Sequence, residues 1–144
     1  MSQNRGLLPM RRLDPAATLP TRAHPDDAGL DLYGLEDAEL APGEGKVVKT
    51  GVAMAIPAGH VGLVCDRSSL GKRGLKTAGG VIDAGYRGEV GVMLWNISRQ
   101  PQALKKGERI AQLLVIPIST PAPVDSEDLG DTARGVGGFG STGR

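Results

Sequence analysis

Aromatic residues are scarce in this sequence of 144 residues, which holds one Phe, one Trp and two Tyr. The hydrophobic core must therefore be built from aliphatic side chains, chiefly Val, Leu, Ile and Ala. A single cysteine, Cys65, excludes an internal disulfide bond. Because Cys65 ends an apolar run, we expect a small buried hydrophobic residue, and its free thiol fits a reducing, cytoplasmic setting.

Strong net charge and long apolar runs are also missing. The formal net charge is +1, so no strong field attracts nucleic acid or an acidic membrane. No apolar run approaches the roughly 20 residues that span a bilayer, and the first residues lack the apolar core of a signal peptide. We therefore expect neither nucleic acid nor a membrane as a partner.

Turn-forming residues are abundant, with 22 Gly and 10 Pro. They separate short apolar segments at close spacing, which is typical of a mostly β antiparallel sandwich or barrel. The length indicates one domain with a single core. Strands are expected at residues 7–13, 28–33, 46–50, 52–56, 61–65, 90–97 and 109–118.

Residues 80–96 contain a turn that holds a carboxylate, a phenol and a guanidinium within five positions. An apolar pair, Val81 and Ile82, leads into Asp83, and the turn that follows contains Tyr86. A second strand follows, so the pattern predicts strand, turn and strand, which we interpret as a hairpin. The turn either presents Asp83 as a functional carboxylate or is structural, with Asp83 bonded to its own backbone.

Two further polar residues lie within apolar strands. Asp31 is flanked by leucines, and Gln112 is the only polar side chain in residues 110–116. If Asp31 faces inward, its carboxylate needs a cation, a hydrogen-bond donor or a metal-bound water, whereas an outward Asp31 needs none. Gln112 is expected to face a polar cavity or a subunit interface, although a structural role competes.

The segment 66–75 interrupts the strand pattern. Ser68 or Ser69 is predicted to cap one short helix that turns Leu70 inward. Hydroxyl groups and free backbone N–H groups at this helix start, with the guanidinium of Arg67 beside them, would form an anion site. The alternative is an ordinary capped turn.

The C-terminal part separates from the rest by composition. Residues 121–131 are acidic and contain proline, as in a linker, and a glycine-rich arm follows that holds the only Phe, Phe139. We therefore divide the chain into a β domain, residues 1–129, and a flexible arm, residues 130–144. An aromatic residue beside Ser, Thr and Arg on an arm suits closure over a base and phosphates, and the alternative is a disordered tail.

Five stretches, taken together and in this order, resemble the five motifs of the trimeric dUTP pyrophosphatases (dUTPases): residues 28–33, 67–70, 80–89, 107–113 and 134–143. The resemblance implies a jelly-roll-like β-barrel or sandwich with one short helix, assembled as a homotrimer with a mobile C-terminal arm. It also implies hydrolysis of dUTP to dUMP and pyrophosphate with Mg²⁺, which keeps uracil out of DNA and supplies dUMP for dTMP synthesis.

The resemblance implies a role for each matching residue. Asp83 would activate the attacking water, Tyr86 would pack on the deoxyribose, and Asp31 would lie near the water shell of the metal ion. Phe139 would stack on uracil, which the main chain of residues 77–80 would read. The residues expected to contact substrate are Arg67, Ser68, Ser69, Gly80, Val81, Ile82, Tyr86, Gln112, Arg134, Phe139, Gly140, Ser141 and Thr142.

Two other functions compete with dUTP hydrolysis. A dCTP deaminase-related enzyme would need a glutamate in the strand after the turn, where Met93 stands and cannot move a proton. A catalytically silent nucleotide-binding trimer would need neither Asp83 nor the arm. The long apolar runs 90–97 and 110–118 favour a threefold interface, and the linker is long enough to bring the arm to the active site of a neighbour.

Overall fold

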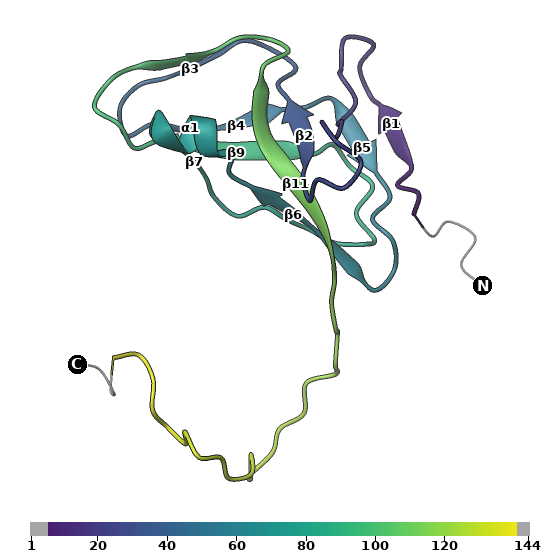
Figure 1. The fold of residues 1–144 in the computed structure, drawn as a ribbon, viewed down its shortest axis with the longest axis vertical. Helices are drawn as coiled ribbons and strands as arrows, with labels where there is room; N and C mark the ends of the chain where they lie inside the picture. The colour runs from purple at the N-terminus through teal and green to yellow at the C-terminus, as the bar shows by residue number, and fades with distance from the viewer. Residues whose placement is uncertain (1–5, 141–144) are drawn as a thin grey trace.

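The computed structural model describes residues 6–140, which form a mostly β body with one short helix (Figure 1). The elements in chain order are β1 (Met10–Arg12), β2 (Leu30–Tyr33), β3 (Ala38–Leu40), β4 (Gly45–Lys49), β5 (Val52–Met54), β6 (His60–Cys65), α1 (Ser68–Lys72), β7 (Leu75–Thr77), β8 (Val81–Ile82), β9 (Gly91–Asn96), β10 (Gln102–Leu104) and β11 (Arg109–Pro117). Each predicted strand is present, although usually shorter than its apolar run. The prediction of a mostly β fold with one short helix is thus confirmed.

The described strands form small antiparallel sheets that do not close into a barrel. The largest sheet has the order β2-β11-β6-β8, and a second sheet has the order β4-β9-β7. Two pairs, β1 with β5 and β10 with β3, flank them. Of the two predicted architectures, the open sandwich therefore describes the strand pairings better than the barrel.

The core between the sheets is aliphatic, as the scarcity of aromatic residues requires. Leu32 on β2 and Leu113 on β11 are fully buried and belong to the same cluster as Val92 and Leu94 on β9. The buried residues of β9 alternate with more exposed ones, so this strand turns one face to the core. Cys65 is only half-buried, because it ends β6 at the edge of the core, and the prediction of a buried cysteine is therefore wrong.

The interpretation of residues 80–96 as a hairpin is wrong. β8 pairs with β6 in the largest sheet, whereas β9 pairs with β4 and β7 in the other. The turn between β8 and β9 thus crosses from one sheet to the other. Its end is fixed to the β4–β5 junction, because Val90 N–H donates to the Val52 carbonyl and Val90 O accepts from Thr50 Oγ1. Asp83 therefore stands at a crossing point between sheets, which periodicity alone does not reveal.

Beyond β11 the described chain contains neither helix nor strand. Residues 118–140 run away from the strands (Figure 1), and nearly all of them are exposed. Phe139 is fully exposed and lies outside the core. Among the described residues, no helix is long and apolar enough to cross a membrane.

Candidate active site

Two polar pockets contain most of the predicted site residues. The Asp31 pocket, of about 410 Å³, is lined by Ala23, Asp27, Ala28, Gly29, Asp31, Arg67, Ser68, Arg109 and Gln112. The Asp83 pocket, of about 230 Å³, is lined by Val64, Gly80, Val81, Ile82, Asp83, Tyr86, Glu89, Val90 and Gly91. β2 and β8 form opposite edges of the largest sheet, so the two pockets lie toward opposite edges of that sheet.

The Asp31 carboxylate has two cationic partners. Arg67 Nε lies 3.4 Å from Asp31 Oδ1, and Arg109 Nε lies 3.6 Å from Asp31 Oδ2. The Asp31 side chain is only 18% exposed. Leu30 and Leu32 on either side of it are buried in the core, so Asp31 points to the opposite face of β2, and of the two orientations left open by the sequence the outward one is correct. The carboxylate is nevertheless shielded there by a pair of guanidinium groups. These groups retain further N–H donors that can bind phosphate oxygens.

Gln112 lies directly opposite Asp31 in the β2–β11 ladder, so both side chains lie on the same face of the sheet. Gln112 Nε2 donates to the carbonyl oxygen of Asp66 at 2.8 Å. A Cβ atom added at Gly29 would lie 2.0 Å from Gln112 Oε1. Gln112 thus faces a polar cavity, as predicted, and Gly29 leaves the space that its amide occupies.

The segment after β6 supplies the serines. α1 begins at Ser68, and its N-cap residue is Arg67, without a side-chain hydrogen bond at the cap. The predicted serine cap is therefore wrong, because Ser68 is already helical and the extended residue before it is an arginine. Leu70 is buried, as predicted. The Ser69 hydroxyl accepts a hydrogen bond from Arg67 Nη1 at 3.2 Å, and Ser69 itself does not line the Asp31 pocket.

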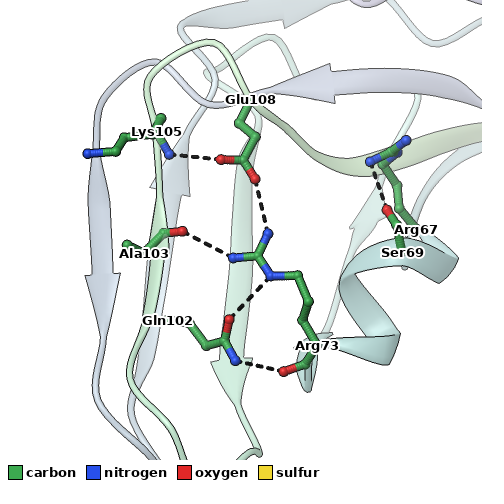
Figure 2. A network of polar contacts seen from close by, with 7 residues as sticks. All are labelled: Arg67, Ser69, Arg73, Gln102, Ala103, Lys105 and Glu108. Atoms are coloured by element: carbon green, nitrogen blue, oxygen red, sulfur yellow. Dashed lines mark hydrogen bonds and ion pairs between the residues drawn. The ribbon is translucent and has the colours of Figure 1, made fainter.

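Arg73 fixes the other end of this segment. Figure 2 shows its guanidinium directed away from α1 toward β10 and the turn before β11, where it donates to Gln102 Oε1, the Ala103 carbonyl and Glu108 Oε2. The last contact is an ion pair of 3.1 Å. Because Glu108 immediately precedes Arg109, Arg73 joins α1 to the start of the strand that positions Arg109 and Gln112.

The Asp83 carboxylate is exposed in its pocket, and no hydrogen bond to it is found within residues 6–140. The carbonyl oxygen of Asp83, not its side chain, accepts the turn hydrogen bond from Tyr86 N–H at 3.1 Å. The alternative in which the carboxylate bonds its own backbone is therefore not what the structure shows. The side chain can accept a proton from a water molecule in the pocket.

Tyr86 is oriented by the turn itself. Its hydroxyl donates to the Glu89 carbonyl at 2.7 Å, and a Cβ atom at Gly88 would lie 2.6 Å from that hydroxyl. Glu89 is held in turn, because its Oε2 accepts from Gly51 N–H at 2.8 Å. The ring of Tyr86, 45% exposed, thus lines the pocket in a fixed orientation.

The described arm residues, 130–140, line neither pocket. Arg134 Nε donates to the Gly137 carbonyl within the arm, and Phe139 and Gly140 are exposed. Ser141 and Thr142 lie outside the described residues. The geometry of the single chain thus leaves the predicted contacts of the arm untested.

Sequence reasoning missed two residues that line the pockets, Arg109 and Glu89, and one, Asp66, whose backbone contacts Gln112. Arg109 was visible only as part of the 107–113 motif, and Glu89 as the end of the 80–89 motif. Asp66 was passed over, although its side chain binds Thr77 N–H, Thr77 Oγ1 and Lys76 Nζ, each at 2.7 Å. Burial raises the pKa of Asp66, but these hydrogen bonds outweigh burial and lower it below the ordinary 3.8.

Comparison with known proteins identifies the family. The dUTPase family model matches residues 16–143. The deoxyuridine 5'-triphosphate nucleotidohydrolase of Nocardia farcinica is 52% identical over 140 residues, which cover 94% of this chain and 85% of the relative. That of Thermobifida fusca is 50% identical over 138 residues, which cover 93% and 77%.

Solved structures agree. The dUTPase of Staphylococcus bacteriophage 80alpha with dUpNHpp superposes with a TM-score of 0.89 at 34% identity, covering 95% of this chain and 98% of that one. A variant dUTPase from phage phi11 of S. aureus, described with a structural Mg(II) ion, gives a TM-score of 0.80 at 33% identity, covering 85% and 97%. This chain belongs to the dUTPase family.

Proposed function

We propose that this protein hydrolyses dUTP to dUMP and pyrophosphate. The observation that supports this most directly is the Asp83 carboxylate, which is exposed in a pocket and held by a turn between two sheets. The relatives from Nocardia farcinica and Thermobifida fusca are named for this activity. The product dUMP would feed dTMP synthesis, and removal of dUTP would keep uracil out of DNA. The free thiol of Cys65 fits a cytoplasmic enzyme.

In this proposal Asp83 acts as the general base. Its carboxylate accepts a proton from a water molecule whose oxygen attacks the α-phosphorus, and pyrophosphate leaves. General-base catalysis of this kind contributes about 10²–10⁴-fold to the rate. The remaining acceleration comes from positioning and charge neutralisation, because phosphoryl transfer needs little covalent chemistry from the protein.

The Asp31 pocket is proposed to bind the phosphates. The guanidinium groups of Arg67 and Arg109 supply charged donors, and Ser68 and Gln112 supply neutral ones. Because hydrogen bonds to ionised phosphate oxygens are stronger than neutral ones, the two arginines should contribute most of the affinity there.

The residues present suit a metal ion that is held mainly by the triphosphate. The described residues include no group of three or more His, Cys, Asp or Glu side chains that could hold one. Asp31 is the carboxylate available beside the phosphate donors, and it could accept hydrogen bonds from the water ligands of Mg²⁺. A bound Mg²⁺ would supply positive charge at the phosphate oxygens.

The Asp83 pocket is proposed to bind the nucleoside. The ring of Tyr86 would pack on the deoxyribose and leave no room for a 2′-hydroxyl. Gly80, Val81 and Ile82 form the wall beside it, and the main chain of residues 77–80 would read uracil. The arm would then close the site, with Phe139 on the base and Arg134, Gly140, Ser141 and Thr142 near the phosphates.

We further propose a homotrimer whose arm serves a neighbouring active site. In the single chain, Trp95 on β9 is 40% exposed and Val47 on the paired strand β4 is 64% exposed. Residues 114–116 in the second half of β11 are only half-buried. Residues 118–140 run away from their own body (Figure 1). Since the two pockets lie toward opposite edges of one sheet, a site that combines pockets of two subunits also fits this topology.

The function is tested by pyrophosphate release from each deoxynucleoside triphosphate in the presence of Mg²⁺. We expect dUTP to be strongly preferred. Ammonia from dCTP without pyrophosphate from dUTP would indicate the deaminase instead, and binding without turnover would indicate a silent trimer.

The shared site is tested by mixing two inactive variants, Asp83→Asn with its arm and a chain truncated before Arg134 with its Asp83. The two are refolded together so that subunits mix. If the arm serves a neighbour, about a quarter of the sites in an equal mixture are complete. If the arm serves its own chain, verified mixed trimers remain inactive.

A further inference from the structure

Asp66 occupies a position between the two pockets that no role in the proposed reaction explains. It follows β6 and precedes Arg67, so its backbone belongs to the phosphate-binding segment. Its carbonyl oxygen accepts the hydrogen bond from Gln112 Nε2. Its carboxylate, in contrast, binds Lys76 and Thr77 at the end of β7.

The hydrogen bonds between Asp66 and Thr77 connect β6 to β7, two strands that do not pair with each other. β7 pairs with β9, and β8 pairs with β6, so within residues 6–140 no ladder joins β6 to β7. Residues 78–80 must therefore cross from one sheet to the other. Asp66 Oδ1 accepts hydrogen bonds from both Thr77 N–H and Thr77 Oγ1, and so fixes the start of the crossing to the exit of β6.

The other end of this crossing, which we name the 78–80 loop, is also fixed to β6. Gly80 O accepts from Val64 N–H at 2.8 Å, and a Cβ atom at Gly80 would lie 2.8 Å from the Val64 carbonyl oxygen. Gly79 and Gly80 have positive φ values of 71° and 99°. Two adjacent glycines make a segment with little stiffness of its own, so its position depends on the contacts at its two ends.

We propose that Asp66 is a specificity-determining positioning residue: it holds the 78–80 loop as a rigid wall of the Asp83 pocket and thereby excludes pyrimidines larger than uracil. This proposal rests on the proposed function, in which that loop reads the base. Gly80, the loop residue that lines the pocket, has no side chain, so this part of the wall can reject a 5-methyl group only if its backbone does not move. Because a single methyl group is worth roughly 10- to 200-fold in discrimination, a small displacement of the wall removes much of it.

The test measures kcat/KM for dUTP and for dTTP. Asp66→Ala should lower the dUTP-to-dTTP ratio by about tenfold or more, chiefly through better use of dTTP. Asp66→Asn keeps an oxygen that can accept from Thr77, and should restore most of the ratio. Thr77→Val removes one of the two donors and should give a smaller loss, and combined with Asp66→Ala it should add nothing further.

Two control variants separate this role from general loosening. Lys76→Met removes the third contact of the carboxylate but keeps both Thr77 hydrogen bonds, and should retain the ratio. Arg73→Ala removes three hydrogen bonds at the far end of the same segment (Figure 2), and should lower dUTP turnover without changing the ratio. Faster amide hydrogen exchange across residues 77–80 in Asp66→Ala, but not in Lys76→Met, would support the proposal independently of activity.

An unchanged ratio in both Asp66→Ala and Thr77→Val would overturn the proposal, as would an equal change in Arg73→Ala. If Asp66→Ala does not fold, Thr77→Val decides alone. A wild-type protein that does not hydrolyse dUTP would instead overturn the proposed function, so the two failures are distinguishable.

Discussion

Replacement of Phe139 by alanine should weaken the closed complex with nucleotide and leave the unliganded fold unchanged. Phe139 is fully exposed and Gly140 after it is exposed, although Gly137 and Gly138 are half-buried. A buried Phe side chain would stabilise the fold by about 1.5–3 kcal/mol, but this ring buries no surface in the single chain. The unfolding free energy without ligand should therefore change by less than about 0.5 kcal/mol.

The complex should respond differently, because the ring is proposed to stack on uracil. Loss of base stacking costs about 1–3 kcal/mol. This corresponds to a roughly 5- to 150-fold weaker Kd for the non-hydrolysable analogue dUpNHpp, measured by calorimetry with Mg²⁺. Phe139→Tyr keeps an aromatic face and should bind nearly as well as the wild type.

Val136 offers a matched control on the same arm. It is equally exposed and has no proposed contact, so Val136→Ala should change neither binding nor stability. Equal Kd values for wild type and Phe139→Ala would refute the stacking role. A loss of more than about 1.5 kcal/mol in unliganded stability would show that Phe139 is buried in the assembled protein and that the arm is structural.

The remaining predictions concern the pockets. Tyr86→Ala should raise kcat/KM for UTP relative to dUTP, since the ring would no longer exclude the 2′-hydroxyl; an unchanged ratio would place that discrimination elsewhere. Gly29→Ala should raise KM for dUTP at least tenfold, because the new Cβ displaces the Gln112 amide; a normal KM would show that the amide does not contact phosphate. The pKa of Asp66 is lowered in the fold, so its carboxylate stabilises the protein above its unfolded pKa of about 3.9, and this contribution disappears as the pH falls through the folded value. The stability gap between wild type and Asp66→Asn in urea unfolding should therefore be larger at pH 7 than at pH 3, and a gap that is independent of pH would contradict this.

The local pattern of the sequence predicted the strands and several buried positions correctly. The leucines on both sides of Asp31 left its orientation open, and the structure shows them in the core and Asp31 on the other face, beside two guanidinium groups. The isolated polar Gln112 pointed to a polar cavity, which the β2–β11 register forms beside Asp31. The inference for Gln112 succeeded because it needed only the cost of leaving a polar group unpaired, whereas the orientation of Asp31 follows from the period of the strand.

Long-range pairing could not be predicted in the same way. Residues 80–96 have the composition of a hairpin, but β8 and β9 join different sheets, since pairing depends on which distant strands are available. Asp66 was overlooked because its partners, Lys76 and Thr77, lie on a strand that reaches it only in the fold. In the proposed trimer the arm lies against a neighbouring chain, so neither the sequence nor a single chain determines its place.

The central claim, that Asp83 activates the water, is tested most directly by Asp83→Asn. The amide is nearly isosteric with the carboxylate but is a poor base, so the variant should fold and bind dUpNHpp with a Kd close to that of the wild type. Pyrophosphate release from dUTP at saturating substrate should fall by about 10²–10⁴-fold. Turnover within a few-fold of the wild type, with binding intact, would contradict the claim and leave Asp83 as a residue that only shapes the turn.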